Sequence, residues 1–200
     1  MTAARHRHLR AVPSDRPASP PQPVDVPAVL SRETLLNARD GDPVAFAQLV
    51  RTYYPRCLRF AQHLLSSRED AEECVQDAFV RVHRALAKYQ ERDRFKAWLF
   101  HILANRCRTA RSRARRFELI RVRMQRFRRS SAPFADPLTA AEQLSQAFAQ
   151  LPHDLREAFQ LRHVDGFSYE QISDITGMGV TAVRMRVSRA GARLRVALGL

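Results

Sequence analysis

The sequence predicts an all-α protein built from two small helical domains that are joined by a flexible basic linker. Three observations predict this fold class. Apolar residues recur at three- and four-residue steps through three segments between residues 31 and 112. Residues 113–137 are rich in arginine and poor in apolar side chains. Toward the C-terminus, a short capped helix, a glycine-containing turn and a longer basic helix predict a helix-turn-helix.

The composition of the chain favours a globular protein with a polyanionic partner. The chain has 200 residues, and 45% of them are apolar, which is enough for the cores of two small domains. Its 34 lysines and arginines outnumber its 20 acids and give a formal net charge of +14. A surplus of this size most often indicates nucleic acid as the partner. The alternative is a basic protein whose charge serves only solubility.

The three cysteines, Cys57, Cys74 and Cys107, include no Cys-x-x-Cys pair, which argues against a disulfide scaffold and a zinc ribbon. They are expected to be small apolar side chains in a reducing cytoplasm, and a redox-sensing thiol is the alternative. No apolar run reaches the length of a membrane span, and no signal peptide is recognisable. The expected location is therefore the cytoplasm.

The changes in composition along the chain predict the domain boundaries. Residues 1–30 contain six prolines and no apolar period, so they should form a disordered tail. Residues 31–112 should form the N-terminal helical domain. Residues 113–137 should be the basic linker, and residues 138–200 the C-terminal helix-turn-helix domain.

Capping residues predict where the helices of the first domain begin. Asp42 is a favourable N-cap, and a proline follows it at the first helical position. Pro55 should kink or divide the helix that begins there. Ser66 or Ser67 should cap the next helix, and the polar segment 90–93 should be the loop before a third.

Local signals also define the second domain, where two helices are expected first, over 139–151 and 152–164. Ser168 followed by Gln171 matches a capping box at the start of the next helix. Gly177 is a natural left-handed end for that helix. Thr181 is expected to cap the final helix, which should run to about residue 198.

The start of the final helix is the first candidate binding surface. Packing of the two helices of the motif through apolar residues would leave one face of the last helix pointing outward. The N-terminal part of such a helix reaches base edges in the major groove, where arginine bonds guanine and hydroxyls bond bases or phosphates. The candidate DNA-binding residues are Thr181, Arg184, Met185, Ser188 and Arg189. The alternative is an ordinary helical hairpin with a solvated basic face.

An acidic face on the helix that begins near residue 68 is the second candidate surface. It contains Asp70, Glu73, Gln76 and Asp77 in a chain that is otherwise strongly basic. Acids in the first turn are explained by the helix dipole, but Gln76 and Asp77 lie beyond that turn. The face suggests a basic protein partner. By charge alone, a merely solvated face is favoured.

The third candidate surface interleaves aromatic residues with arginines after residue 88. Such a pattern can stack and hold unpaired bases. Trp98, at helical spacing from its apolar neighbours, is better explained as core, whereas Tyr89 and Asn105 are less easily explained so. Arg106 and Arg108 complete the candidate set.

No motif in the sequence indicates catalysis. A phosphate-binding glycine loop, a zinc-protease motif and a nucleophile elbow are all absent from the sequence, so no catalytic residue and no cofactor is expected. His101 and Cys107 could face one another on a helix. A single such pair is a poor ligand set, so no metal site is expected.

Four sequence blocks together resemble the extracytoplasmic-function (ECF) group of bacterial sigma factors, over residues 32–115 and 138–198. The blocks are GDPVAFAQLVRTYYPRCLRFAQHLL, REDAEECVQDAFVRVHRAL, RFKAWLFHILANRCR and LPHDLREAFQLRHVDGFSYEQISDITGMGVTAVRMRVSRAGARLR. Their order makes the resemblance more specific than any one block, because a helix-turn-helix alone fits many regulators.

The resemblance implies a role for each surface in transcription initiation, with core RNA polymerase and promoter DNA as partners. The acidic face would bind the clamp helices of the largest polymerase subunit. Tyr89, Asn105, Arg106 and Arg108 would open the minus-10 element and capture a flipped base. The second domain would sit on the polymerase flap and read the minus-35 element, and the linker would lie within the polymerase. The family also implies an anti-sigma partner, although no residue here identifies it.

Two other classes of protein remain as alternatives at this point. A stand-alone helix-turn-helix regulator with an N-terminal sensor domain would bind duplex DNA by itself, usually as a dimer on a palindrome. An RNA-binding or nucleoid protein would use the arginines at 111–129 and show little sequence preference.

Overall fold

A computed structural model of the chain describes residues 30–90, 94–124 and 139–199, with the side chains of 117–124, 140 and 141 excepted. All secondary structure within these ranges is helical, as the sequence predicts. The expected disordered tail and most of the expected linker lie outside the described residues.

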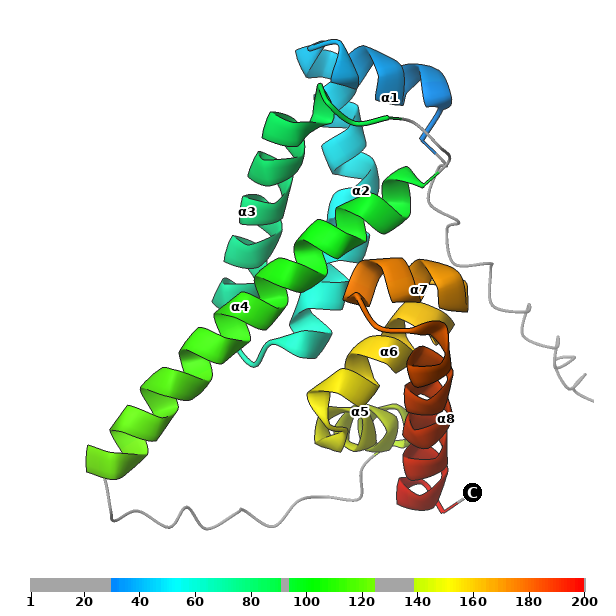
Figure 1. Ribbon diagram of the computed structural model, residues 1–200. Helices are drawn as coiled ribbons and strands as arrows, with labels where there is room; N and C mark the ends of the chain where they lie inside the picture. The colour runs from blue at the N-terminus through cyan, green and yellow to red at the C-terminus, as the bar shows by residue number, and fades with distance from the viewer. Residues whose placement is uncertain (1–29, 91–93, 125–138, 200) are drawn as a thin grey trace, which may run out of the picture.

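Four helices form the N-terminal half of the described structure (Figure 1): α1 (Arg32–Arg39), α2 (Pro43–Leu64), α3 (Arg68–Leu86) and α4 (Phe95–Met124). Asp42 caps α2 by accepting a hydrogen bond from the Val44 amide at 2.8 Å, and Ser67 caps α3. α2 continues through Pro55, so the expectation of a helix divided at that residue is wrong. Burial of apolar side chains on both sides of the proline holds the two halves in one helix.

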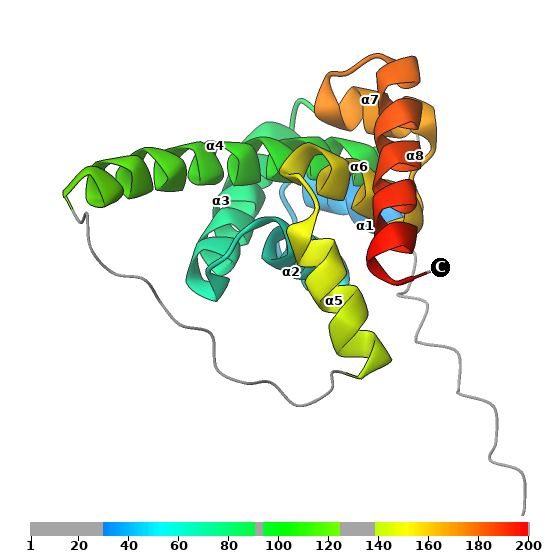
Figure 2. The ribbon, with the colours of Figure 1, turned by 90° about the horizontal axis from the view of Figure 1, so that it is seen from below.

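The first core lies between α2, α3 and α4, which pack on one another. Its fully buried side chains include Leu49, Phe60, Val75, Leu99 and Leu103. These residues recur at helical spacing in the sequence, so the core follows directly from the periodicity. α4 passes residue 112, the expected end of the first domain, and its far end projects away from the other helices (Figures 1 and 2).

Four shorter helices form the C-terminal half: α5 (Ala140–Gln150), α6 (His153–His163), α7 (Tyr169–Thr176) and α8 (Val180–Ala197). The predicted capping box of Ser168 and Gln171 is confirmed at the start of α7. Gly177 ends α7 with a φ of 74°, in the left-handed region that glycine adopts without strain.

The cap of the final helix is one prediction that the structure corrects. Gly179 is the N-cap of α8, and its carbonyl accepts from the Val183 amide at 3.1 Å. Thr181 therefore lies inside the first turn. The turn between α7 and α8 is shorter than expected because glycine, like threonine, is acceptable at an N-cap.

The two halves pack against each other, which the sequence does not predict. α7 lies against the first half of α4, and α6 lies against α2 (Figures 1 and 2). Phe100 of α4 meets Phe167, just before α7, with ring centroids 5.0 Å apart. One cluster of buried side chains consequently extends from the helices of the first half into α6, α7 and α8.

Candidate nucleic-acid and polymerase interfaces

The outer face of α8 carries the residues expected to read the minus-35 element. Each of them is exposed: Thr181, Arg184, Met185, Ser188 and Arg189. On the opposite face, Val183 and Val187 are buried, as are Ile172 and Ile175 of α7. The predicted packing of the helix-turn-helix is therefore confirmed, and it presents the candidate residues to solvent together.

Neighbouring arginines on α8 have different surroundings. The Arg184 guanidinium lies 5.3 Å from the Tyr169 ring centroid and 3.9 Å from the Glu170 carboxylate, and both side chains of the Arg184–Glu170 pair are largely exposed. Arg186 is half-buried and turned toward Asp154 of α6, at 3.6 Å. Arg184 is thus free to reach a ligand, whereas Arg186 holds α8 against α6.

The acidic face of α3 is only partly solvated. Asp70, Glu73 and Gln76 are exposed. Asp77 is half-buried and forms an ion pair with Arg106 of α4. One of the residues expected to contact the polymerase is therefore bound to a residue expected to contact promoter DNA. This pairing is not apparent from the sequence, because 29 positions separate the two residues.

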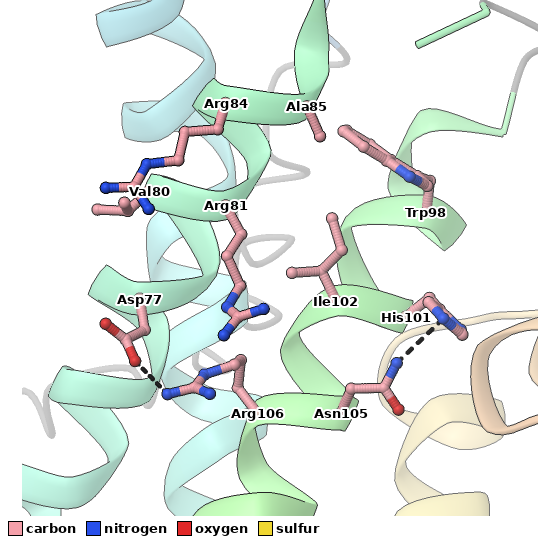
Figure 3. A pocket seen from close by; sticks show the side chains of 10 residues that line it. All are labelled: Asp77, Val80, Arg81, Arg84, Ala85, Trp98, His101, Ile102, Asn105 and Arg106. Carbon is pink, nitrogen blue, oxygen red and sulfur yellow. Dashed lines mark hydrogen bonds and ion pairs between the residues drawn. The ribbon is translucent and has the colours of Figure 1, made fainter. Parts of the chain in front are cut away.

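A pocket of about 660 Å³ opens between α3 and α4 beside this ion pair (Figure 3). Trp98, Asn105 and Arg106 line it from α4. Arg81 and Arg84 line it from α3, and the sequence analysis missed both of them. Their signal was available, since two arginines three residues apart at the exposed end of an apolar helix share one face. The pocket combines a flat aromatic ring with three guanidinium groups, as a site for an unpaired base and its phosphate would.

Tyr89 lies behind Trp98 rather than in the pocket wall. Its ring stacks on Trp98 with centroids 4.7 Å apart and meets the edge of Phe95 at 5.6 Å. Phe95 is buried, and Tyr89 and Trp98 are half-buried. Trp98 therefore packs beside the core and also lines the pocket. Its interpretation as a core residue and its interpretation as a base-stacking residue are compatible.

Other candidate residues of α4 are in contact with the C-terminal end of α7. Arg108 donates to the Thr176 carbonyl at 3.1 Å and to the Asn105 side-chain oxygen at 2.7 Å. The His101 Nδ1 atom lies 3.0 Å from the Asp174 carbonyl. The last carbonyls of a helix lack partners within that helix and carry partial negative charge, so they attract cations. His101 and Arg108 of α4 therefore supply hydrogen-bond partners for the last carbonyl groups of α7.

Charged groups are buried where the halves meet. The Lys96 ammonium donates to the Asp165 carbonyl and lies 4.2 Å from the centre of the Phe167 ring. Burial raises the pKa of the Asp165 carboxyl to about 6, while burial lowers the pKa of Lys96. At the rim, Arg94 pairs with Asp174 at 3.1 Å with both side chains exposed. The contact between the halves thus combines an aromatic centre with polar groups around it.

The described ranges offer neither a metal-binding group of side chains nor a membrane-spanning helix. They contain no group of three or more histidine, cysteine or acidic side chains placed to hold a metal ion. No helix in the same ranges is long and apolar enough to cross a membrane.

Comparison with known families gives two matches, in the order that the sequence blocks predict. The family described as Sigma-70 region 2 matches residues 49–117, from α2 through the first part of α4. The family described as Sigma-70, region 4 matches residues 141–194, which include most of α5 and α8 and the helices between them.

Similar proteins of known function span most of the chain. RNA polymerase sigma factor CarQ of Myxococcus xanthus is 33% identical over 162 residues, covering 80% of this chain and 93% of that protein. The ECF RNA polymerase sigma-E factor of Escherichia coli is 32% identical over 162 residues, covering 75% of this chain and 84% of that protein.

Solved structures with similar folds agree with these matches. The sigma factor RpoE of Bartonella quintana, solved in complex with the anti-sigma factor NepR, is 29% identical with a TM-score of 0.63. The alignment covers 78% of this chain and 97% of that one. CnrH, solved in complex with the cytosolic domain of CnrY, is 29% identical with a TM-score of 0.62 and covers 86% of this chain and 98% of its own. The chain belongs to the ECF group of the sigma-70 family of RNA polymerase sigma factors.

Proposed function

We propose that this sigma factor acts in the cytoplasm as a detachable specificity subunit of RNA polymerase, with no catalytic activity of its own. It directs initiation by recognising promoter DNA while bound to the core enzyme. The observation that carries the proposal is the order of region 2 and region 4 along one chain. We assign region 2 to residues 31–112, the linker to 113–137 and region 4 to 138–200.

Recognition of the minus-35 element is assigned to the exposed face of α8. Arg184 and Arg189 offer guanidinium groups for guanine edges or phosphates, and Thr181 and Ser188 offer hydroxyls. Met185, 48% exposed, offers an apolar contact of the kind that a thymine methyl accepts. Region 4 as a whole would rest on the polymerase flap.

Opening of the minus-10 element is assigned to the pocket between α3 and α4 and to the residues around it. Trp98, supported from behind by Tyr89, supplies a stacking surface. Asn105 supplies an amide for the edge of a base, and Arg106 and Arg108 supply charge for the single strand. The described geometry adds Arg81 and Arg84 to this set.

Binding to the polymerase clamp helices is assigned to two exposed acids and one exposed amide of α3. Asp70, Glu73 and Gln76 can meet a basic partner directly. Asp77 acts differently, because its carboxylate is already paired with Arg106. Its role would be to fix Arg106 at the pocket as well as to add negative charge to the face.

Arg108 of α4, one of the residues assigned to the minus-10 element, is hydrogen-bonded to the end of α7. Arg108 cannot give the same N–H group to DNA and to the Thr176 carbonyl, so it has to release the end of α7 before it binds the minus-10 strand through that group. A similar sigma factor, RpoE, was solved in a complex with the anti-sigma factor NepR, and CnrH was solved in a complex with the cytosolic domain of CnrY. We propose an anti-sigma factor for this chain as well, acting on the arrangement in which the two halves are together.

The test of the proposed function is run-off transcription with sigma-free bacterial core polymerase on a pool of random promoters, with and without this protein. Specific initiation that depends on the protein would support the sigma role, and sequencing of the active templates would define the promoter. Tight binding of the protein alone to palindromic duplex sites, without initiation, would instead favour a stand-alone regulator. Binding without sequence preference would favour a nucleoid or RNA-binding protein.

A further inference from the structure

Two cysteines meet where α3 packs on α4. Cys74 lies on α3 and Cys107 lies on α4, and both are buried. The Asp77–Arg106 ion pair, and the pocket that Cys74 lines with Arg106 and Ala110, place the two cysteines at the same level of this contact, although 33 positions separate them in sequence. The remaining cysteine, Cys57 of α2, is also buried. A structural role as small apolar groups explains the burial of all three but not the pairing of two.

The two paired thiols differ in their access to solvent. Cys74 is 4% exposed and lines a pocket of about 320 Å³ with Arg106, Thr109 and Arg113. Cys107 is 0% exposed and does not line this pocket. A small solute that enters the pocket would therefore reach Cys74 before Cys107, which is fully buried. This is the arrangement that a two-cysteine oxidation requires.

The surroundings of Cys74 favour its thiolate. The neighbouring Cys107 thiol lowers the pKa of the Cys74 thiol below its ordinary value, and the Arg106 guanidinium lowers it further. Burial and the nearby carboxylates of Glu73 and Asp70 act in the opposite direction. The Arg106 Nε–H group is itself buried with no hydrogen-bond partner in the described part of the chain. This N–H group can therefore donate a hydrogen bond to a negatively charged sulfur or oxygen that forms at the pocket.

We propose that Cys74 and Cys107 are a modification site, a dithiol that a small hydroperoxide converts into a reversible intramolecular disulfide. The Cys74 thiolate attacks the terminal peroxide oxygen, the O–O bond breaks, and the sulfur becomes a sulfenic acid while an alkoxide or hydroxide leaves and takes up a proton. The Cys107 sulfur then attacks the Cys74 sulfur, its proton goes to the departing hydroxyl, and water leaves. The dithiol is oxidised by two electrons and the peroxide is reduced by two.

The bond would join two surfaces that the proposed function keeps distinct. Cys74 follows Glu73 on the acidic face, and Cys107 lies between Arg106 and Arg108 in the sequence. A disulfide holds two sulfurs about 2.0 Å apart, closer than any contact between thiols, so α3 and α4 must adjust to form it. The oxidation of Cys74 and Cys107 does not depend on the sigma role.

The test is to treat the fully reduced, folded protein with hydrogen peroxide and then to unfold it in an alkylating reagent. Intact mass and peptide mapping report which thiols have been lost. We expect the wild type and Cys57→Ala, the matched control, to lose two hydrogen atoms, to retain at most one alkylatable thiol, and to yield one cross-linked peptide containing residues 74 and 107. Dithiothreitol should restore all the thiols.

Single variants separate the two roles. Cys107→Ser should leave a sulfenic acid at Cys74 that dimedone labels, and Cys74→Ser should consume peroxide more slowly and give neither product. A wild-type protein whose thiols all remain alkylatable after peroxide would overturn the proposal. A cross-link through Cys57, or one between two chains, would overturn it equally, because neither follows from the pocket.

Discussion

The two surfaces expected to bind promoter DNA differ in their contacts with the rest of the chain. On α8, the five candidate residues are all exposed. On α4, Arg108 and His101 are turned toward the end of α7. The difference arises because α7 ends in unpaired carbonyls, which suit the cationic and polar groups that a nucleic acid would also attract. Arg108, a residue expected to bind promoter DNA, is therefore held by another part of its own chain.

The largest expected effect comes from removing the aromatic centre that joins the two halves. Phe167 is 1% exposed and meets Phe100, so Phe167→Ala should cost about 3–5 kcal/mol in the free energy of unfolding and should let α7 separate from α4. Denaturant unfolding and the radius of gyration in solution measure these effects. Phe159→Ala is the control, since that half-buried ring packs within the second half alone. Equal expansion of both variants would contradict the account.

The pH dependence of stability tests the buried carboxyl at the same contact. The pKa of Asp165 is raised from 3.8 to about 6, so the folded state holds this proton more tightly than the unfolded state does. Its unfavourable contribution is absent below about pH 4, grows as the pH rises to about 6, and stays constant above that. Asp165→Asn, which cannot ionise, should therefore be more stable than the wild type by up to about 3 kcal/mol at neutral pH.

Urea unfolding at about pH 4 and pH 7.5 measures this difference. We expect the advantage of Asp165→Asn to shrink at the lower pH, where the wild-type carboxyl is protonated. Asp174→Asn, on the exposed rim of the same contact, provides the control. An advantage that is independent of pH would mean that the amide stabilises the contact for some other reason.

The exposed surface is tested by Arg184→Ala. A good base contact is worth about 1–3 kcal/mol, so discrimination between promoters with intact and altered minus-35 elements should fall by roughly 5- to 150-fold while polymerase binding persists. Competition between the two promoters in transcription measures this ratio. Arg193→Ala, also exposed on α8 but farther from its start, should retain the discrimination. Equal loss of transcription at all promoters would argue against a base contact by Arg184.

The smallest expected effect is at the rim of the contact between the halves. The Arg94–Asp174 pair is exposed on both sides, and such pairs contribute about 0–1 kcal/mol. Arg94→Ala should therefore change stability by less than about 1 kcal/mol, and high salt should weaken even that effect. A loss as large as that of Phe167→Ala would show that charge, rather than the aromatic centre, holds the halves together.

The sequence predicted those features that depend on neighbouring residues. The caps at Asp42 and Ser168 and the left-handed end at Gly177 require only a few residues on either side, so their signals are local. The exposed face of α8 follows from helical periodicity in the same way. Thr181 was misassigned because two acceptable caps lie two residues apart and the turn itself decides between them.

The contacts between distant segments could not be predicted in this way. Phe100 is one of the aromatic residues that alternate with arginines after residue 88, and its partner Phe167 is remote in sequence. Asp77 looked like an exposed acid, and Arg108 looked like a free cation. Their partners became apparent only when α3, α4 and α7 were placed in space. Periodicity shows which face of a helix is apolar, but it does not show which other helix covers that face.

The central claim is that α7 binds Arg108, a residue proposed to contact the minus-10 strand, in the free protein and releases it in the initiation complex. The most direct measurement is the distance between spin labels on Ser112 of α4 and Glu170 of α7, both exposed, by pulsed electron resonance. The account predicts one short, narrow distribution for the free protein and a longer distance on core polymerase with promoter DNA. The same distance in both states, or a broad distribution in the free protein, would contradict it.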